Sequence, residues 1–433
     1  MTFTLLVAAA VFPLILAFVV ACFRDPLRFA LPVYAALIPF SSLLAVAPGP
    51  FGSVSSLMGL LLGLALVTQL VTTRRGNDQI PLQLPVWLAF LALCGFSLFW
   101  SVAPGDTVND FLVMASLVLL FAALALSRFD AAVLRRFETA IVVGGVLIVC
   151  YGLVQLLFLG GLPAPGGRAA RFGNDLLGAN NQAASLLLPL AIAMHRTLTR
   201  VGRSRPVYGA VTLLLLFGVV MTGSRGGLLA TLVVLAVVVF LTTARRAAVF
   251  AVVASAVVLL LAVLIFNPGG VGRRQLEGTD SSGRSDIWAV GLHACSSYCL
   301  TGAGWGGFPR VYALEQASAP EAKVLKRGTA WEPHNIYLLA VVEVGVLGLV
   351  LLLVGLGLAL VDAWRLPHAL RAPPVAALLG TVVTSIFLSN LEFKFFWAVL
   401  IYIVASASVA AVPRTSAAAP PLGRLVPAGQ GIA

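Results

Sequence analysis

The sequence predicts an all-α integral membrane protein that crosses the bilayer many times. Hydrophobic residues make up 60% of the 433 residues and charged residues only 10%, which leaves too few polar side chains to cover a water-soluble globule of this size. The apolar residues gather in runs of about 17 to 25 residues, and a helix of that length crosses about 30 Å of hydrocarbon. Because these runs lack the alternation of barrel strands, we expect the spans to be helices.

Thirteen apolar segments are candidate spans, and we expect about twelve transmembrane helices, twelve or thirteen in all. The segments are Phe3 to Phe23, Phe29 to Ala47, Phe51 to Thr73, Leu82 to Val102, Phe111 to Ser127, Phe137 to Gly160, Gln182 to Leu198, Pro206 to Thr222, Gly226 to Thr243, Ala247 to Phe266, Ile336 to Val361, Val375 to Leu388 and Phe396 to Val412.

Arginines in alternate connections orient these spans, because short loops rich in Lys and Arg stay in the cytoplasm. The connections hold Arg24 and Arg28, Arg74 and Arg75, Arg128 with Arg135 and Arg136, Arg196 to Arg205, Arg245 and Arg246, and Arg365 with Arg371. With Arg414 and Arg424 they account for seventeen of the 28 basic residues. Membrane topology therefore explains most of the net charge of +12, and a nucleic-acid partner is not indicated.

The other eleven basic residues fall on the opposite face, where this rule would normally remove them, so we expect them to meet anionic groups. They are Arg168, Arg171, Arg225, Arg273, Arg274, Arg284, Arg310, Lys323, Lys326, Arg327 and Lys394. Seven lie between Asn267 and Pro333 among acidic residues, which predicts a folded extramembrane lobe. The chain then divides into a transmembrane region over 1–266, the lobe over 267–333, C-terminal spans over 334–412 and a disordered cytoplasmic tail over 413–433.

Two short motifs place an arginine beside glycine on this face. Thr222-Gly-Ser-Arg-Gly-Gly227 lies between two apolar spans, so Arg225 sits at the membrane boundary, where a charge usually faces a cavity or a partner. The alternative is a turn whose arginine reaches lipid phosphate. Gly283-Arg-Ser-Asp-Ile-Trp288 supplies Arg284 at a predicted helix start; the alternative there is a surface ion pair with Asp286.

A histidine marks the point where the lobe returns to the membrane. Pro333-His-Asn-Ile-Tyr337 opens a long apolar helix. The dipole of that helix disfavours a protonated imidazole, so His334 is suited to accept a proton near neutral pH. The alternative is a structural histidine, which is the commoner role for a single one.

Two further pairs are expected to be structural. Cys295 and Cys299 are four residues apart on a predicted helix, where disulfide geometry is unfavourable, and we expect neither a bond nor a metal site there. Glu392 and Lys394 belong to the last short hairpin, and we expect an ion pair between them.

The motifs occur in a particular order, which resembles the O-antigen ligase family within the wider ligase and polymerase superfamily. Gly-Ser-Arg-Gly is followed by Gly-Arg with a nearby Trp, then by Gly302-Ala-Gly-Trp-Gly-Gly307, and then by Pro-His-Asn-Ile-Tyr-Leu running into Glu343-Val-Gly345. The match covers about Arg171 to Gly348. The resemblance implies a membrane glycosyltransferase fold of the C type with twelve spans, both termini in the cytoplasm, and a periplasmic active site at the bacterial inner membrane.

The resemblance also implies roles for individual residues. Arg225 and Arg284 would bind the diphosphate of an undecaprenyl-linked glycan donor, with Arg168 or Arg171 adding phosphate contacts, and His334 would activate a hydroxyl of the lipid A-core acceptor. Guanidinium groups hold phosphate oxygens in pairs and stabilise the charge on the leaving diphosphate, so neither a metal nor another cofactor is expected. Direct attack would invert the anomeric centre. Lys326 and Arg327 either contact acceptor phosphates or form a solvated basic turn.

Three other functions stay open from the sequence. A polymerase would transfer the same donor to another lipid-linked repeat, and a protein O-oligosaccharyltransferase would transfer it to a serine; the short segment after the last span counts against the second. A transporter of anionic lipid-linked substrates would place charges near the middle of several spans. Here Arg225, His334 and the lobe gather at one face instead.

Overall fold

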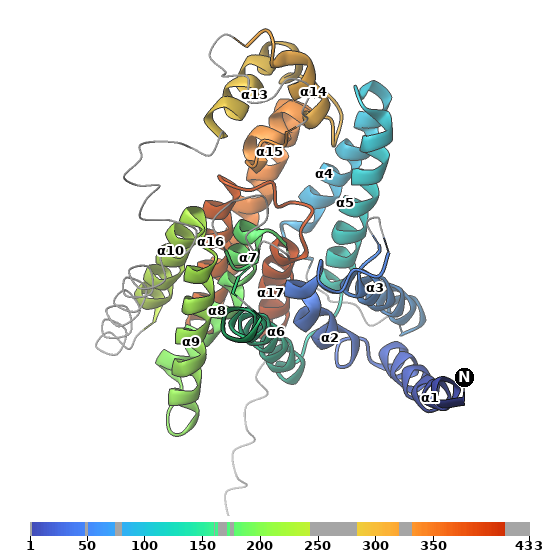
Figure 1. Ribbon diagram of the computed structural model, residues 1–433, viewed down its shortest axis with the longest axis vertical. Helices are drawn as coiled ribbons and strands as arrows, with labels where there is room; N and C mark the ends of the chain where they lie inside the picture. Colours follow the sequence, from blue (N-terminus) through green and yellow to red (C-terminus); the bar gives the residue numbers. More distant parts are fainter. Residues whose placement is uncertain are drawn as a thin grey trace, which may run out of the picture.

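The computed structural model describes residues 2–47, 51–73, 80–159, 161–162, 171–173, 177–242, 284–319 and 331–411. Within these ranges every regular element is a helix, and the one β-type pairing is an isolated bridge between Ala45 and Ser53. The prediction of an all-α protein is therefore confirmed. Figure 1 shows the helices as a bundle with a smaller helical group, α13 and α14, above it.

The helices follow one another along the chain with short connections between most of them. They are α1 (Thr2–Arg24), α2 (Ala30–Leu37), η1 (Ile38–Phe40), α3 (Val54–Thr73), α4 (Leu84–Phe96), η2 (Ser97–Trp100), α5 (Pro104–Ala125), α6 (Ala131–Phe158), α7 (Ala179–Ser185), α8 (Leu187–Thr199), α9 (Ser204–Met221), α10 (Arg225–Leu241), α13 (Arg284–Tyr298), α14 (Phe308–Glu315), α15 (Ile336–Trp364), α16 (His368–Ser385) and α17 (Lys394–Ala411).

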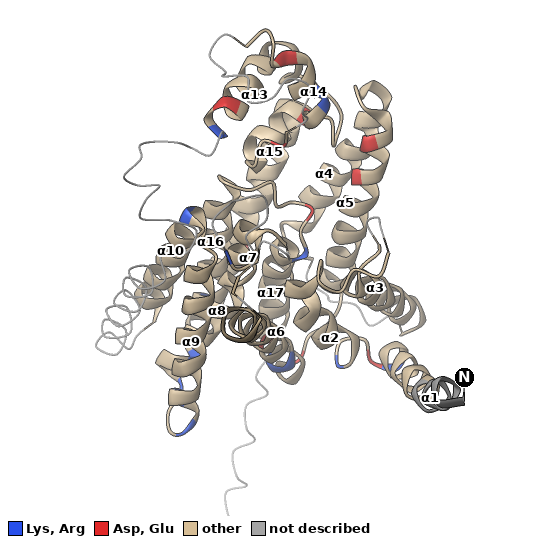
Figure 2. Ribbon diagram, viewed as in Figure 1, with Lys and Arg blue, Asp and Glu red and all other residues tan. Residues whose placement is uncertain are grey.

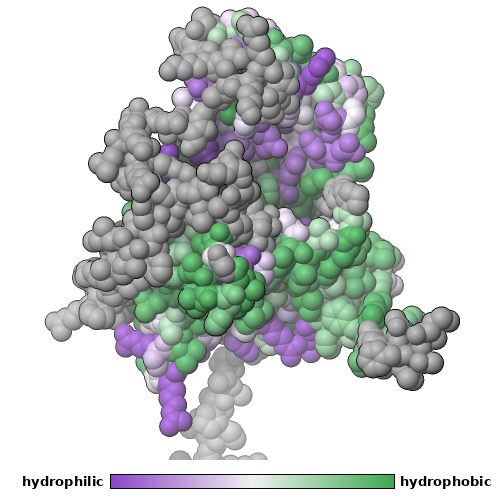
Figure 3. All heavy atoms as spheres, viewed as in Figure 1, coloured by the Kyte–Doolittle hydropathy of each residue, from purple (hydrophilic) through white to green (hydrophobic). Residues whose placement is uncertain are grey.

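Six helices in the described part of the chain are long and apolar enough to cross a membrane: α3, α5, α6, α9, α15 and α17. Shorter apolar helices accompany them, among them α4 and α10. Figure 3 shows the apolar side chains as a band across the middle of the molecule, with hydrophilic side chains above and below it. A band of this kind is what a hydrocarbon layer requires, and it identifies a multi-pass membrane protein.

Some predicted spans are broken helices, and two of the breaks fall next to prolines. The segment Gln182 to Leu198 divides into α7 and α8 at Leu186, because Pro189 has no N–H to donate to the carbonyl of Ser185. The segment Phe29 to Ala47 holds α2, whose 8 residues reach only about 12 Å, and then η1 with Pro39. Residues 247–266 lie outside the described part of the chain, so the total of about twelve spans stays a prediction.

Charge divides the bundle into two ends. Figure 2 shows basic side chains gathered at its lower end, around the starts of α6 and α9, whereas acidic side chains gather toward the upper end. We call the lower end, formed by the 25–28 turn, the start of α6 and the α8–α9 connection, the arginine-rich end. The upper end, where α10, α13 and α15 start, is the site end. This separation is the one that the loop arginines predicted.

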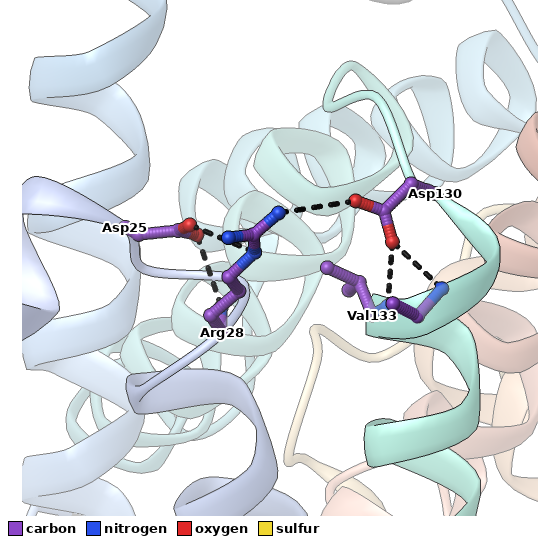
Figure 4. A network of polar contacts seen from close by, with 5 residues as sticks. Asp25, Arg28, Asp130 and Val133 are labelled. Carbon is purple, nitrogen blue, oxygen red and sulfur yellow. Dashed lines mark hydrogen bonds and ion pairs between the residues drawn. The ribbon is translucent and has the colours of Figure 1, made fainter.

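An ion-pair network joins two connections at the arginine-rich end (Figure 4). Arg28 contacts Asp25 at 3.2 Å and Asp130 at 3.5 Å. Asp130 also caps α6 by accepting from the backbone N–H groups of Ala132 and Val133, both at 2.7 Å. The amide of Val133 is the main reason that the pKa of Asp130 lies below its usual range. The turn after α1 is thereby tied to the start of α6.

Arg196 has a structural role besides its place among the loop arginines. Its guanidinium is buried in α8, where it pairs with Glu138 of α6 and donates to the hydroxyl of Tyr208 on α9 at 2.6 Å. Tyr402 of α17 donates to the other oxygen of Glu138 at 2.7 Å. Four helices therefore share one buried polar network.

Removing one member of this network should destabilise the bundle, because the remaining charge stays buried without its partner. We expect Arg196→Ala to lower the free energy of unfolding by about 3–5 kcal/mol, measured by SDS-induced unfolding in detergent micelles. The exposed Arg200 caps the C-terminus of the same helix, so Arg200→Ala is the matched control and should change little. Equal unfolding curves for the two variants would contradict the role given to Arg196.

Candidate functional site

Helix α15 is broken where the sequence motif Glu343-Val-Gly345 passes through it. Val344 and Gly345 leave the helical conformation, and Gly345 takes φ 75° and ψ −175°. A side chain at this position would meet the carbonyl oxygen of Leu300, 2.6 Å from an added Cβ. The backbone N–H of Val346 donates instead to the carbonyl of Cys299 at 2.8 Å. The break therefore opens α15 to the segment that follows α13.

The turn Gly302-Ala-Gly-Trp-Gly-Gly307 docks into this break. The N–H groups of Ala303 and Gly304 donate to the carbonyls of Val342 and Glu343, both at 2.8 Å. The buried carboxylate of Glu343 in turn accepts from the N–H groups of Gly306 at 2.9 Å and Phe308 at 3.0 Å. Two sequence motifs that lie about 40 residues apart along the chain thus form one hydrogen-bonded unit.

Glycine is required at Gly302 for two reasons. Its φ of +88° is strained for any residue with a side chain, and an added Cβ would lie 2.3 Å from the carbonyl oxygen of Glu343. Trp305, in the same turn, is fully buried, and its backbone N–H donates to Ser97 at 2.9 Å. The turn is therefore also anchored to the segment between α4 and α5.

Helix α13 packs across the first turns of α15 and against α14. An added Cβ at Gly291 would lie 2.9 Å from the side chain of Leu338 and 3.1 Å from that of Phe308, so the absence of a side chain lets these helices approach. At the end of α13, Cys295 and Cys299 form a disulfide. The prediction of no bond is wrong: α13 ends at Tyr298, one residue before Cys299, and the Cα atoms of the two cysteines lie 4.4 Å apart, within reach of a disulfide.

His334 occupies a strained and well-anchored position just before α15. Its φ of 47° is the only positive value for a non-glycine residue in the described part of the chain, and such a conformation costs about 1–3 kcal/mol. On one side, the indole N–H of Trp288 donates to the carbonyl of Pro333 at 2.8 Å. On the other, the side chain of Asn335 caps α15 by accepting from the N–H groups of Tyr337 and Leu338. The backbone on both sides of His334 is thereby anchored.

Arg225 and Arg284 are each the first residue of a helix, α10 and α13 respectively. Their charges act on one another: burial and then the charge of Arg225 lower the pKa of Arg284. The charge of Arg284 also reaches His334, whose pKa is lowered from 6.5 first by burial and then by this arginine. Three residues that lie far apart in the sequence therefore influence one another electrostatically, and their assignment to one catalytic site stays a prediction.

The turn that presents Arg225 is braced from two sides. Ser224 caps α10 by accepting from the N–H of Gly227 at 3.1 Å. The guanidinium of Arg171 donates to the carbonyl of Thr222 at 2.6 Å and to the side chain of Asn180 at 3.1 Å. Arg171 thus lies beside the Arg225 turn and supports it; its contact with phosphate stays a prediction. Arg168, Lys326 and Arg327 lie outside the described residues.

The site has the chemistry of an anion-binding site with a base beside it. Helix N-termini attract anions through their unpaired N–H groups and their dipoles, and α10 and α13 each add a guanidinium at that point. No ion pair joins Arg284 to Asp286, although both lie in the described part of the chain, so the surface-pair alternative is not supported. Burial together with the adjacent cation favours neutral imidazole, which can accept a proton.

Several residues of this region were not assigned from the sequence. Trp288 and Asn335 position His334, and Glu343 holds the docked turn. The asparagine before an apolar run was a usable signal, since Asn is a common helix cap. The contacts of Glu343 join distant segments, so no local pattern indicates them.

The prediction of an ion pair between Lys394 and Glu392 is wrong. The ammonium of Lys394 donates instead to serine hydroxyls at the start of α3, and it forms no ion pair with Glu392.

Fold and site together define a class of protein: a polytopic, all-helical membrane protein with two arginines and a histidine clustered at one end. Residues 210–353 match the family model for O-antigen ligase. This segment holds Arg225, Arg284 and His334, together with the docked turn and Glu343, and the family that it matches is the one that the motifs predicted. Members of this family are glycosyltransferase-like enzymes of O-antigen and related pathways. No curated protein matches the chain.

The docking of the 302–307 turn into α15 can be tested by a substitution that adds one methyl group. We expect Gly302→Ala to destabilise the site end, because the alanine meets both the backbone of α15 and an unfavourable φ, a conformational cost of about 1–3 kcal/mol before the clash is counted. Gly357→Ala is the matched control, since nothing lies within 4 Å of an added Cβ there. The measurement is the melting temperature of each purified variant in detergent. A Gly302→Ala protein as stable as Gly357→Ala would show that the turn does not dock as described.

Proposed function

We propose that the protein is an O-antigen ligase of the bacterial inner membrane, which transfers a glycan from undecaprenyl diphosphate to a sugar hydroxyl of lipid A-core. The observation that carries this proposal is the convergence of Arg225, Arg284 and His334 at one end of the helical bundle. That end lies opposite the arginine-rich end. The positive-inside rule then favours a site that faces the periplasm.

The two arginines suit the donor. A diphosphate has oxygens on both phosphorus atoms, and two guanidinium groups at helix N-termini can bind them while compensating their charge. When the glycosidic bond to the donor breaks, negative charge grows on the leaving diphosphate, and the same cations stabilise it more strongly than in the ground state. In this mechanism the protein itself supplies the positive charge that the leaving group needs.

His334 suits the acceptor step. Neutral imidazole takes the proton from the attacking hydroxyl, the hydroxyl oxygen bonds to the anomeric carbon, and undecaprenyl diphosphate departs from the opposite face. The product is an inverted glycosidic linkage formed in one displacement, with no covalent enzyme intermediate. In this proposal the positive-φ backbone of His334, anchored by the contacts of Trp288 and Asn335, presents the imidazole to the acceptor.

The proposal predicts which glycans a deletion strain accumulates. Without the protein, O-antigen should be missing from lipid A-core while polymerised lipid-linked glycan builds up, as seen on lipopolysaccharide gels and in extracts of the lipid-linked pool. His334→Ala, Arg225→Ala and Arg284→Ala should each fail to restore ligation, by a factor of about 100 or more for loss of a general base or of charge stabilisation.

Arg310→Ala provides a matched control, because Arg310 is an exposed arginine of the same end with no assigned role. A pool that stops at one repeat unit would identify a polymerase instead. If the three alanine variants are present in the membrane and fully active, the assignment of these residues to the site is wrong.

The lowered pKa of His334 predicts the pH dependence of transfer. Because the neutral imidazole is the active form, activity should hold as pH falls to 6.5 and decline only below it, where the imidazole gains a proton. Arg284→Gln removes the neighbouring charge, so the residual activity of that variant should decline at a higher pH than wild type. Both profiles can be measured with purified protein and radiolabelled donor. An acidic limb above pH 6.5 in the wild type would argue against His334 as the base.

A further inference from the structure

Lys394 lies in a cluster of serine hydroxyls at the site end of the bundle. Its ammonium, at the start of α17, donates to Ser56 at 2.9 Å, to Ser55 at 3.0 Å and to Ser53 at 3.4 Å. Ser55 in turn donates to Ser41 at 3.0 Å. These partners are neutral groups, and the hydroxyls of Ser53 and Ser56, which line a cavity beside the ammonium, can turn a proton toward an anion that approaches it.

Two cavities meet at this cluster, and both are lined by Lys394 and Ser56. The first, which we call the polar cavity, has a volume of about 320 Å³ and a mixed lining that includes the polar side chains of Ser41, Ser53 and Glu392. The second has a volume of about 330 Å³ and lies between α3 and α5, with Leu60, Gly63 and Leu120 among its largely apolar lining residues. None of Arg225, Arg284 and His334 lines either cavity. The cluster is therefore a separate place in the fold.

The apolar cavity opens toward the surface that the bilayer covers. Leu60 and Leu64 of α3 and Leu119 of α5 are 46%, 61% and 56% exposed, and Figure 1 shows these two helices adjacent at the side of the bundle. A hydrocarbon chain can therefore reach the cavity from the membrane without crossing a polar region.

We propose that this pair of cavities binds one membrane phospholipid, with its phosphate on Lys394 and the serine hydroxyls and an acyl chain in the cavity between α3 and α5. An ammonium and several hydroxyls together form the charge-assisted hydrogen bonds that phosphate oxygens accept. The adjoining apolar walls favour a lipid over free phosphate, because the chain gains contact with them when the phosphate binds.

The acidic neighbour is compatible with this ligand. Glu392 lines the polar cavity, and its pKa is raised well above the usual range by burial and by the charges of Asp110, Glu343 and Glu332. A protonated carboxyl carries no charge to repel phosphate and can donate a hydrogen bond to it. Protonation of Glu392, which its raised pKa favours, leaves the charge of Lys394 facing the polar cavity.

The test is a lipid-binding measurement on the purified full-length protein, delipidated in detergent, with phosphatidylglycerol as the probe. Native mass spectrometry and the lipid-induced rise in melting temperature report binding independently of glycan transfer, so the result does not depend on the proposed function. We expect Lys394→Gln to weaken binding about tenfold or more. Arg310→Gln removes one exposed positive charge at the same end and should leave binding unchanged.

A second variant tests the chain cavity while keeping Lys394. An added Cβ at Gly63 lies 3.8 Å from Leu120, so Gly63→Leu fits on the helix and fills the cavity; we expect it to weaken phosphatidylglycerol binding as well. Diacylglycerol, which lacks the phosphate, and inorganic phosphate, which lacks the chain, should each fail to stabilise the wild type. Unchanged binding by both variants, or full stabilisation by either partial ligand, would overturn the proposal.

Discussion

The site depends on the docking of the 302–308 turn into the break of α15. Once Glu343 accepts two backbone N–H groups of that turn, the end of α13 is fixed against the middle of α15. The start of α13, which carries Arg284, then has a defined position relative to His334 at the start of α15. A buried carboxylate with no partner would be costly, so the turn and the helix break stabilise each other. Glycines at both contact surfaces allow the backbones to touch.

Electrostatics at the site favour an anionic ligand and a neutral base together. The charges of Arg225 and Arg284 act on each other and repel, and an anion bound between them offsets that repulsion. The same positive field keeps a proton off His334, which is the state that a general base needs. The strained backbone of this histidine fits the same picture, because strain persists only where the surroundings impose it. Trp288 and Asn335 are those surroundings.

The basic residues of the chain serve several physical purposes, although composition treats them alike. Many arginines lie in loops at one end, where they bias the orientation of the helices. Arg196 instead joins four helices through a buried network with Glu138, and Arg171 supports the turn that presents Arg225. Lys394 is surrounded by hydroxyls beside two cavities. A count of charge per face therefore indicates where anions could bind, but the neighbours of each cation decide its role.

The sequence by itself determined the features that depend on local pattern. Runs of apolar residues predicted the helices of a membrane protein, and the ordered motifs predicted the family. The grouping of Arg225, Arg284 and His334 was also predicted from the sequence, because all three lie in connections assigned to the same face. Only the tertiary structure decided the rest. The disulfide of Cys295 and Cys299 depends on where α13 ends, the serine partners of Lys394 come from α3, and Glu343 bonds to a turn about 40 residues away. Such contacts depend on how distant segments pack together, and a local sequence pattern does not indicate which segments meet.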